Sequence, residues 1–312
     1  MRLLPLLLAA GSFALPSAPD TSRNITTELF STLSELSLLV DISYCVNALT
    51  PGISQPFSCA SFCSQFPSFE LITTFHTGLT LSDSCGYIAL SHAPSPRRIV
   101  VAFRGTYSLA NALVDLSFAP QQYIPYPGGE ECHNCTVHAG FLSSWEETSK
   151  LISPVIASLK GKYEGYELVL LGHSLGGAVA ALAALEYHSL GWEPQVTTFG
   201  EPRVGNKGLA EFLDARFADG AYRRVTHVND PVPLLPFDRL GYWPHQGEVF
   251  IGKTELPPEK DDVWTCEGAM DESCSAGSGL TVWGGLESHR DYFHRLGLCL
   301  PQGGWRIEVE GS

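Results

Sequence analysis

One pentapeptide constrains the fold of this 312-residue chain more than any other feature. Residues 172–176 read Gly-His-Ser-Leu-Gly, the only Gly-x-Ser-x-Gly in the sequence. An apolar run at 168–171 predicts a short buried strand before it, and good helix formers at 178–187 predict a helix after it. A serine in this setting lies on a sharp turn that lifts its hydroxyl clear of the sheet. Ser174 is therefore a candidate nucleophile; the alternative is a glycine-rich turn with an incidental serine.

The rest of the chain alternates predicted strands with predicted helices. The strands are expected at 86–90, 98–103, 196–199 and 224–228, and the helices at 29–40, from 143 onward and at 207–217. Strands separated by helices require crossover connections, which favour a predominantly parallel central sheet. A composition of 44% hydrophobic and 17% charged residues suffices for one sizeable core, and we find no repeat or linker. We predict a single α/β domain over residues 15–312.

The first 14 residues have the features of a secretory signal peptide. Arg2 supplies a positive charge, residues 3–10 are apolar, and Ser-Phe-Ala at 12–14 offers a cleavage site after Ala14. This apolar run is too short to span a bilayer, which takes about 20 residues, and no other stretch is long enough. We expect an exported, extracellular protein without an integral membrane segment.

The nine cysteines agree with an oxidising destination, and eight of them can pair. Three pairs are close in sequence and three cysteines remain: Cys59 with Cys63, Cys132 with Cys135, Cys266 with Cys274, and then Cys45, Cys85 and Cys299. A zinc site would be the competing interpretation of Cys132-x-x-Cys135, but no second such pair and no paired histidines lie nearby. We expect no metal. Asn24 and Asn134 begin N-glycosylation acceptor tripeptides.

The formal net charge of -14 argues against two classes of partner. Nucleic acids and anionic membranes both attract basic surfaces, so neither is expected to bind this acidic chain electrostatically. The charge does not exclude contact with an uncharged lipid surface through apolar groups. No feature of the sequence defines the oligomeric state, and we expect a monomer.

A nucleophilic serine needs a histidine to accept its proton and a carboxylate to fix the tautomer of that histidine. His289 follows a glycine-rich loop, which suits a catalytic base. The other downstream histidines are expected in other settings: His188 in a helix, His227 in a strand, His245 in local packing, and His294 as a structural or surface residue. Asp230 directly follows the predicted strand at 224–228, where active-site loops of parallel sheets lie. Asp-Pro also starts turns, so spacing alone leaves the role of Asp230 open.

Several separate motifs carry a family resemblance. They are Val-Ala-Phe-Arg-Gly-Thr at 101–106, Val-His-Ala-Gly-Phe at 137–141, the serine pentapeptide, Gly-Glu-Pro-Arg-Val-Gly-Asn at 200–206, Asn-Asp-Pro at 229–231, and His289 followed by Tyr292-Phe293. From about Cys45 to Cys299 the chain resembles the filamentous-fungal lipases of the class 3 lipase family, which also contains a feruloyl esterase branch.

The resemblance implies an α/β-hydrolase fold with a lid helix over the active site. It implies that Ser174, Asp230 and His289 form a catalytic triad. It also implies that Thr106 shares the oxyanion hole with the backbone N–H of Leu175. Acyl transfer of this kind requires no cofactor or metal.

The resemblance also implies two disulfides. Cys45 is expected to pair with Cys299, and Cys132 with Cys135. Cys85 then has no partner and is expected to be a buried free thiol.

In this family a lid follows the oxyanion residue. After Tyr107, the apolar residues of 107–118 that recur at helical spacing are Leu109, Ala112, Leu113 and Leu116. Such a helix can cover an apolar cleft in water and turn its apolar face to lipid. An ordinary amphipathic helix facing the core has the same spacing. The composition favours a secreted lipase that acts on acylglycerols at a lipid–water interface.

Other features point toward a different ester. Position 112 is Ala where many lids of the family carry Trp, and Gly-Glu-Pro at 200–202 and the Cys266–Cys274 insertion look more like the feruloyl esterase branch. A feruloyl esterase-like or other soluble-ester carboxylesterase is therefore the alternative. A non-catalytic lipid-binding protein of the same fold would be signalled by a lost triad member, and none is missing.

Overall fold

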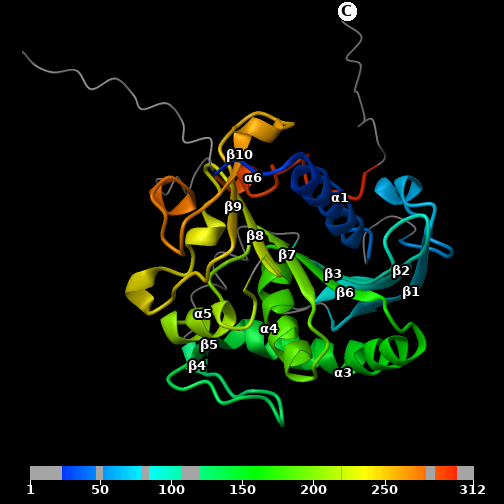
Figure 1. Cartoon of the computed structure of the whole chain (residues 1–312), viewed down its shortest axis with the longest axis horizontal. Helices are drawn as coiled ribbons and strands as arrows, with labels where there is room; N and C mark the ends of the chain where they lie inside the picture. Colours follow the sequence, from blue (N-terminus) through cyan, green and yellow to red (C-terminus); the bar gives the residue numbers. More distant parts are fainter. Residues whose placement is uncertain are drawn as a thin grey trace, which may run out of the picture.

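The structure is a computed structural model that describes residues 23–46, 52–78, 84–106, 120–218, 220–278 and 285–300. Its main feature is an eight-stranded sheet in the order β1-β2-β3-β6-β7-β8-β9-β10 (Figure 1). The five consecutive strands from β3 to β9 in this order run parallel, whereas β1, β2 and β10 join antiparallel at the two edges. The predominantly parallel sheet predicted from the sequence is confirmed for its centre.

The strands of this sheet are β1 (Phe69–His76), β2 (Cys85–Ser91), β3 (Arg98–Arg104), β6 (Glu167–His173), β7 (Gln195–Phe199), β8 (Tyr222–His227), β9 (Glu248–Ile251) and β10 (Val263–Thr265). A separate antiparallel pair consists of β4 (Pro120–Gln122) and β5 (Thr136–His138). The described helices are α1 (Thr27–Ser43), α3 (Ala139–Lys162), α4 (Leu175–Ser189), α5 (Lys207–Asp214) and α6 (Gly285–Ser288). Short 3-10 helices cover Phe62–Gln65, Val232–Leu234, Asp238–Leu240, Lys260–Asp262 and Ser275–Gly277.

Helices cover both faces of the sheet, with α1 on one side and α3 and α4 on the other (Figure 1). Successive strand residues point to opposite faces. In β3, Val101 and Phe103 therefore belong to the core beneath α3 and α4, whereas Ala102 belongs to the core beneath α1. Because both faces are buried, the strand is a nearly continuous apolar run in the sequence.

Helix α3 begins at residue 139, four residues before the start expected from its apolar pattern. The cap is His138, whose Nδ1 accepts a hydrogen bond from the N–H of Phe141 at 3.3 Å. Histidine is not among the usual capping residues, so the sequence gives little signal for this start. The helix continues through Pro154. Helix α5 ends at residue 214, short of the predicted 217.

The cysteines pair in the pattern expected from the sequence. Disulfides join Cys45 to Cys299, Cys59 to Cys63, Cys132 to Cys135 and Cys266 to Cys274, and Cys85 is a buried free thiol. Asn24 and Asn134 are both exposed. The predicted signal peptide at 1–14 lies outside the described residues. Among the described helices, none is long and apolar enough to cross a membrane.

Candidate active site

Ser174 lies at the carboxyl end of β6, directly before α4. Its φ of 58° and ψ of -129° place it in a region that side chains with a Cβ rarely adopt. The two glycines of the pentapeptide permit this turn. A Cβ on Gly172 would lie 2.2 Å from the carbonyl oxygen of Gly176, and one on Gly176 would lie 2.4 Å from that of Phe103. The serine is therefore fixed by a close crossing of strand and helix, as the pentapeptide predicted.

His289 and Asp230 form a buried pair. Nδ1 of His289 lies 3.0 Å and 2.9 Å from the two carboxylate oxygens of Asp230, and both residues are at most 1% exposed. A carboxylate only accepts hydrogen bonds, so Nδ1 carries the proton of the neutral ring and Nε2 is left with a free lone pair. Within the described part of the chain, Nε2 has no hydrogen-bond partner. It is thus available to accept a proton.

Two groups besides the imidazole determine the state and position of Asp230. The carboxylate accepts hydrogen bonds from the N–H of Val232 at 2.9 Å and from the hydroxyl of Tyr292 at 2.6 Å. Burial alone would raise the pKa of the Asp230 carboxyl. The neighbouring His289 and these hydrogen bonds outweigh that effect and hold the pKa below its usual value. Asp230 is accordingly ionised at neutral pH and able to stabilise a protonated imidazole.

The contribution of Tyr292 is not evident from the sequence, where the residue served only as part of a motif. Tyr292 is fully buried, and burial raises the pKa of its hydroxyl well above the usual value, so the group stays a donor. Gly200 has no side chain and so leaves space for the Tyr292 hydroxyl. A Cβ there would lie 2.5 Å from the Tyr292 hydroxyl and 2.6 Å from Cε1 of His289, and the φ of 59° also favours glycine.

The remaining histidines have other surroundings. His245 is buried against Glu201, with Nε2 3.0 Å from a carboxylate oxygen. Nδ1 of His294 lies 3.3 Å from the Ser37 hydroxyl. His245 thus packs locally, as expected, and His294 has the structural role that was one of its two expected settings.

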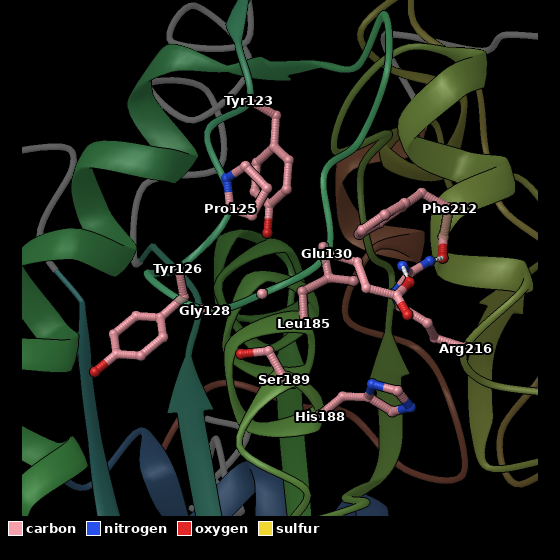
Figure 2. A pocket seen from close by; sticks show the side chains of 11 residues that line it. Tyr123, Pro125, Tyr126, Gly128, Glu130, Leu185, His188, Ser189, Phe212 and Arg216 are labelled. Carbon is pink, nitrogen blue, oxygen red and sulfur yellow. Dashed lines mark hydrogen bonds and ion pairs between the residues drawn. The ribbon is translucent and has the colours of Figure 1, made fainter.

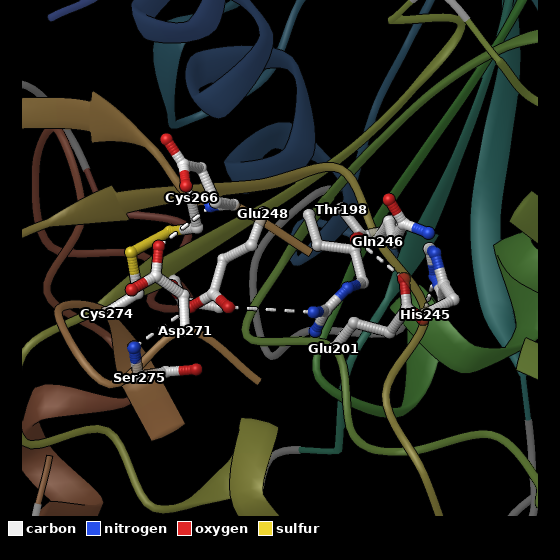
Figure 3. A network of polar contacts seen from close by, with 12 residues as sticks. Thr198, Glu201, His245, Gln246, Glu248, Cys266, Asp271, Cys274 and Ser275 are labelled. Carbon is white, nitrogen blue, oxygen red and sulfur yellow. Dashed lines mark hydrogen bonds and ion pairs between the residues drawn. A yellow bond between two sulfur atoms is a disulfide. The ribbon is translucent and has the colours of Figure 1, made fainter. Parts of the chain in front are cut away.

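Glu201, which in the sequence suggested the esterase branch, is part of a buried polar network (Figure 3). Its carboxylate accepts hydrogen bonds from the hydroxyls of Thr198 and Tyr222, each at 2.7 Å, in addition to the contact with His245. Burial raises the pKa of Glu201, but the charge and hydrogen bond of His245, together with Arg224, lower it below its usual value. The residue therefore ties β7 to β8 from inside the protein.

The expected oxyanion residues lie on segments that approach Ser174. Thr106 follows Gly105 at the end of β3, and a Cβ on Gly105 would lie only 2.7 Å from Cβ of Ser174. Leu175 is the first residue of α4, where backbone N–H groups have no partner within the helix. The structure thus brings both segments to Ser174. The expected lid residues, Tyr107, Leu109, Ala112, Leu113 and Leu116, lie outside the described residues.

One surface pocket of about 170 Å³ lies elsewhere on the protein (Figure 2). His188 and Ser189, at the carboxyl end of α4, line it together with Phe212 and Arg216 of the α5 region. The Arg216 guanidinium lies 3.2 Å from the Phe212 ring centroid and forms an ion pair with Glu130. Ser174 precedes the opposite end of α4, so this pocket is separate from the candidate active site.

Among the described residues, one cluster of side chains of the types that can bind metals lies outside the candidate triad. Ligand atoms of Cys266, Asp271 and Cys274 lie within 4.8 Å of one another. The two cysteines are joined by a disulfide, so neither offers the thiolate that would bind a metal. Asp271 instead accepts hydrogen bonds from Ser273 and from the N–H of Glu267.

Comparison with known proteins identifies the family of this chain. The family model of class 3 lipases matches residues 100–240. Secreted mono- and diacylglycerol lipase 2 of Gibberella zeae is 46% identical over 92% of this chain and 86% of that protein. The chain belongs to the class 3 lipase family. It is therefore a lipase, a carboxylic ester hydrolase, and its similarity to relatives named as secreted agrees with the predicted export.

Further relatives support the assignment of this class 3 lipase. Lipase A of Sodiomyces alcalophilus is 44% identical over 92% of this chain and 86% of its own length. The crystal structure of Lip2 lipase from Yarrowia lipolytica superposes with a TM-score of 0.82 at 33% identity and covers 89% of this chain and 97% of the other. The predicted family and α/β-hydrolase fold are thus confirmed.

Proposed function

We propose that this lipase hydrolyses acylglycerols, with mono- and diacylglycerols among its preferred substrates, through an acyl intermediate on Ser174. The observation that carries this proposal is the buried His289–Asp230 pair, which leaves Nε2 of His289 without a hydrogen-bond partner in the described structure. The strained backbone of Ser174 between β6 and α4 supports its role as the nucleophile. The relative of Gibberella zeae is named a mono- and diacylglycerol lipase. Membership of the same family supports the same substrate class here.

In the acylation step, Oγ of Ser174 attacks the ester carbonyl carbon while Nε2 of His289 takes the serine proton. Asp230 stabilises the resulting imidazolium through its contact with Nδ1. The backbone N–H of Leu175 and Thr106 are proposed to bind the oxyanion; losing one such donor typically raises a barrier by about 2.7–4 kcal/mol. His289 then returns the proton to the departing glyceryl oxygen.

In the deacylation step, water replaces the alcohol. His289 removes a proton from the water, whose oxygen attacks the acyl carbon. When the second tetrahedral intermediate collapses, the proton returns to Oγ of Ser174 and the fatty acid leaves. Every proton transfer uses the same Nε2, so a single imidazole serves as base and acid in turn.

Glu201 does not discriminate between the lipase and feruloyl esterase alternatives. Its carboxylate is 1% exposed and is satisfied by Thr198, Tyr222 and His245, so it serves the interior of the protein. The apolar composition of residues 107–118, where the family resemblance predicts a lid, supports a substrate presented at a lipid–water interface. The proposed enzyme acts there as a monomer, with its leader removed after residue 14 and residues 15–312 as one domain.

The test compares hydrolysis of emulsified triacylglycerol, diacylglycerol and monoacylglycerol with that of methyl ferulate, below and above the solubility limit of each substrate. We expect fast turnover of partial glycerides and a sharp rise in rate when an interface forms. Fast turnover of methyl ferulate with inert glycerides would refute the substrate assignment. Intact mass of the secreted protein checks the cleavage site, and its decrease after glycosidase treatment checks sugars at Asn24 and Asn134.

A further inference from the structure

A chain of hydrogen bonds links the oxyanion segment to the base segment through two residues with no assigned role. Tyr44 is the residue that caps the carboxyl end of α1, and His173 is the last residue of β6. They lie 129 positions apart in the sequence, and both are at most 2% exposed. Each contacts a segment that the proposed mechanism requires to be fixed.

His173 binds the main chain of the base. Its Nε2 lies 2.8 Å from the backbone carbonyl oxygen of His289, and the two imidazole rings stack with centroids 4.6 Å apart. A carbonyl only accepts, so Nε2 of His173 must carry a proton. Burial and the neighbouring His289 lower the pKa of His173 to about 3, which keeps the ring neutral with a single N–H.

The direction of the remaining bonds follows from that tautomer. Nδ1 of His173 has no proton and lies 2.5 Å from the Tyr44 hydroxyl, so the hydroxyl donates to it. The oxygen of that hydroxyl in turn accepts the backbone N–H of Gly105 at 3.1 Å. The three hydrogen bonds therefore all donate in the same direction, from the N–H of Gly105 to Tyr44, from Tyr44 to His173, and from His173 to the carbonyl of His289.

Gly105 is a sensitive position for such a bond. It directly precedes Thr106, the expected oxyanion residue, and has no room for a Cβ between Ser174 and the Tyr44 hydroxyl. Tyr44 is itself anchored, since the Cys45–Cys299 disulfide joins the next residue to the segment that follows His289. A displacement of the hydroxyl would thus be transmitted to the strand end that carries Thr106.

We propose that Tyr44 and His173 are positioning residues that hold the oxyanion segment at Gly105-Thr106 and the base His289 in register with Ser174. Neither contacts the reacting atoms in this account. The neutral imidazole of His173 connects the two segments, so the oxyanion donors and the base are fixed by one set of bonds. This inference rests on the proposed triad.

The test uses Tyr44→Phe and His173→Phe, with Tyr87→Phe as the matched control. The Tyr87 hydroxyl is also buried and donates to a main-chain carbonyl, that of Leu39 at 2.8 Å, but it lies outside the chain of bonds. On a soluble p-nitrophenyl ester we expect kcat to fall about tenfold or more in the two variants with KM nearly unchanged, because misplaced catalytic groups slow chemistry. Tyr87→Phe should keep the wild-type kcat.

A second readout separates positioning from loss of stability. An alkyl boronic acid forms a tetrahedral adduct on Ser174 whose oxygen occupies the oxyanion site. Its affinity for Tyr44→Phe should fall in proportion to kcat, although Tyr44→Phe and Tyr87→Phe lose similar thermal stability. Unchanged kcat and boronate affinity in a folded Tyr44→Phe enzyme would overturn the proposal, and this variant alone decides it if His173→Phe fails to fold.

The double variant tests whether the two residues act together. Because one chain of bonds passes through both, Tyr44→Phe/His173→Phe should lose little more activity than the worse single variant. Losses that multiply would contradict the coupling. Ser174→Ala distinguishes failure of the proposed triad from failure of the positioning role. Activity in Ser174→Ala would overturn the triad. An inactive Ser174→Ala together with a fully active Tyr44→Phe would overturn only the positioning role of Tyr44 and His173.

Discussion

Replacing Tyr292 by Phe removes the hydroxyl that donates to Asp230 and leaves the ring in place. The bond is 2.6 Å long, its acceptor is an ionised carboxylate, and both side chains are buried. A hydrogen bond to a charged group contributes about 1.5–3 kcal/mol to stability, so we expect Tyr292→Phe to lower the free energy of unfolding by about 2 kcal/mol at neutral pH. The corresponding drop in Tm for a chain of this size is about 3 °C.

The pH dependence of this loss has a definite sign. The Asp230 carboxyl has a pKa below its usual value of 3.8 in the folded protein. Its ionised form therefore contributes stability that is fully present above that value and is lost as the pH falls through the lower pKa of the folded state. The difference between wild type and Tyr292→Phe should accordingly be constant from pH 5 to 7 and shrink below about pH 4.

Urea unfolding at several pH values measures this difference, and Tyr187→Phe is the control. The Tyr187 hydroxyl is also buried, but its partner is the neutral Ser153 hydroxyl at 3.1 Å, so its loss should be smaller, about 1 kcal/mol. Activity of Tyr292→Phe on a soluble ester should fall about tenfold, because Asp230 keeps its contacts with His289. Equal losses in the two variants, or a loss in Tyr292→Phe that grows toward low pH, would refute the reasoning.

The remaining predictions concern Asp230, the glycine beside Tyr292 and His289, and the long disulfide. Asp230→Asn should fold but lower kcat by about 10⁴-fold, because an amide does not fix the tautomer of His289; titration of hydrolysis by pH-stat measures it, and a loss below tenfold would exclude Asp230 as the acid. Gly200→Ala should destabilise the protein by about 2 kcal/mol and reduce kcat, since its Cβ meets Tyr292 and His289 and its φ is positive; an unchanged Tm would contradict this. The double variant Cys45→Ala/Cys299→Ala should lose about 5 kcal/mol of stability, because the disulfide closes a loop of 254 residues, and chemical unfolding under non-reducing conditions tests it.

The features that the sequence predicts well are those encoded locally. The Gly-x-Ser-x-Gly turn needs only five adjacent residues, and the central strands are continuous apolar runs because helices cover both of their faces. Strand β1, in contrast, has a mixed burial pattern at the sheet edge, and β9 and β10 have only four and three residues. Such short or half-exposed strands have little periodicity to detect.

The contacts within the site were harder to predict because they join distant positions. Asp230 and His289 could be selected from chain order and family motifs, although spacing alone left the role of Asp230 open. The Tyr44–His173 contact and the donation from Tyr292 to Asp230 depend on which buried hydroxyl faces which acceptor. No local pattern specifies this, since it follows from how α1 and the segment after α6 pack on the sheet.

The central claim is that Ser174 attacks the ester and is the group that carries the acyl chain. The most direct measurement is to react the secreted enzyme with an alkyl p-nitrophenyl phosphonate and to locate the label by peptide mass spectrometry while following diacylglycerol hydrolysis. We expect one label per chain, on Ser174, with activity lost in proportion to labelling and no label on Ser174→Ala. Labelling at another residue that abolishes activity, or full activity after Ser174 is labelled, would contradict it.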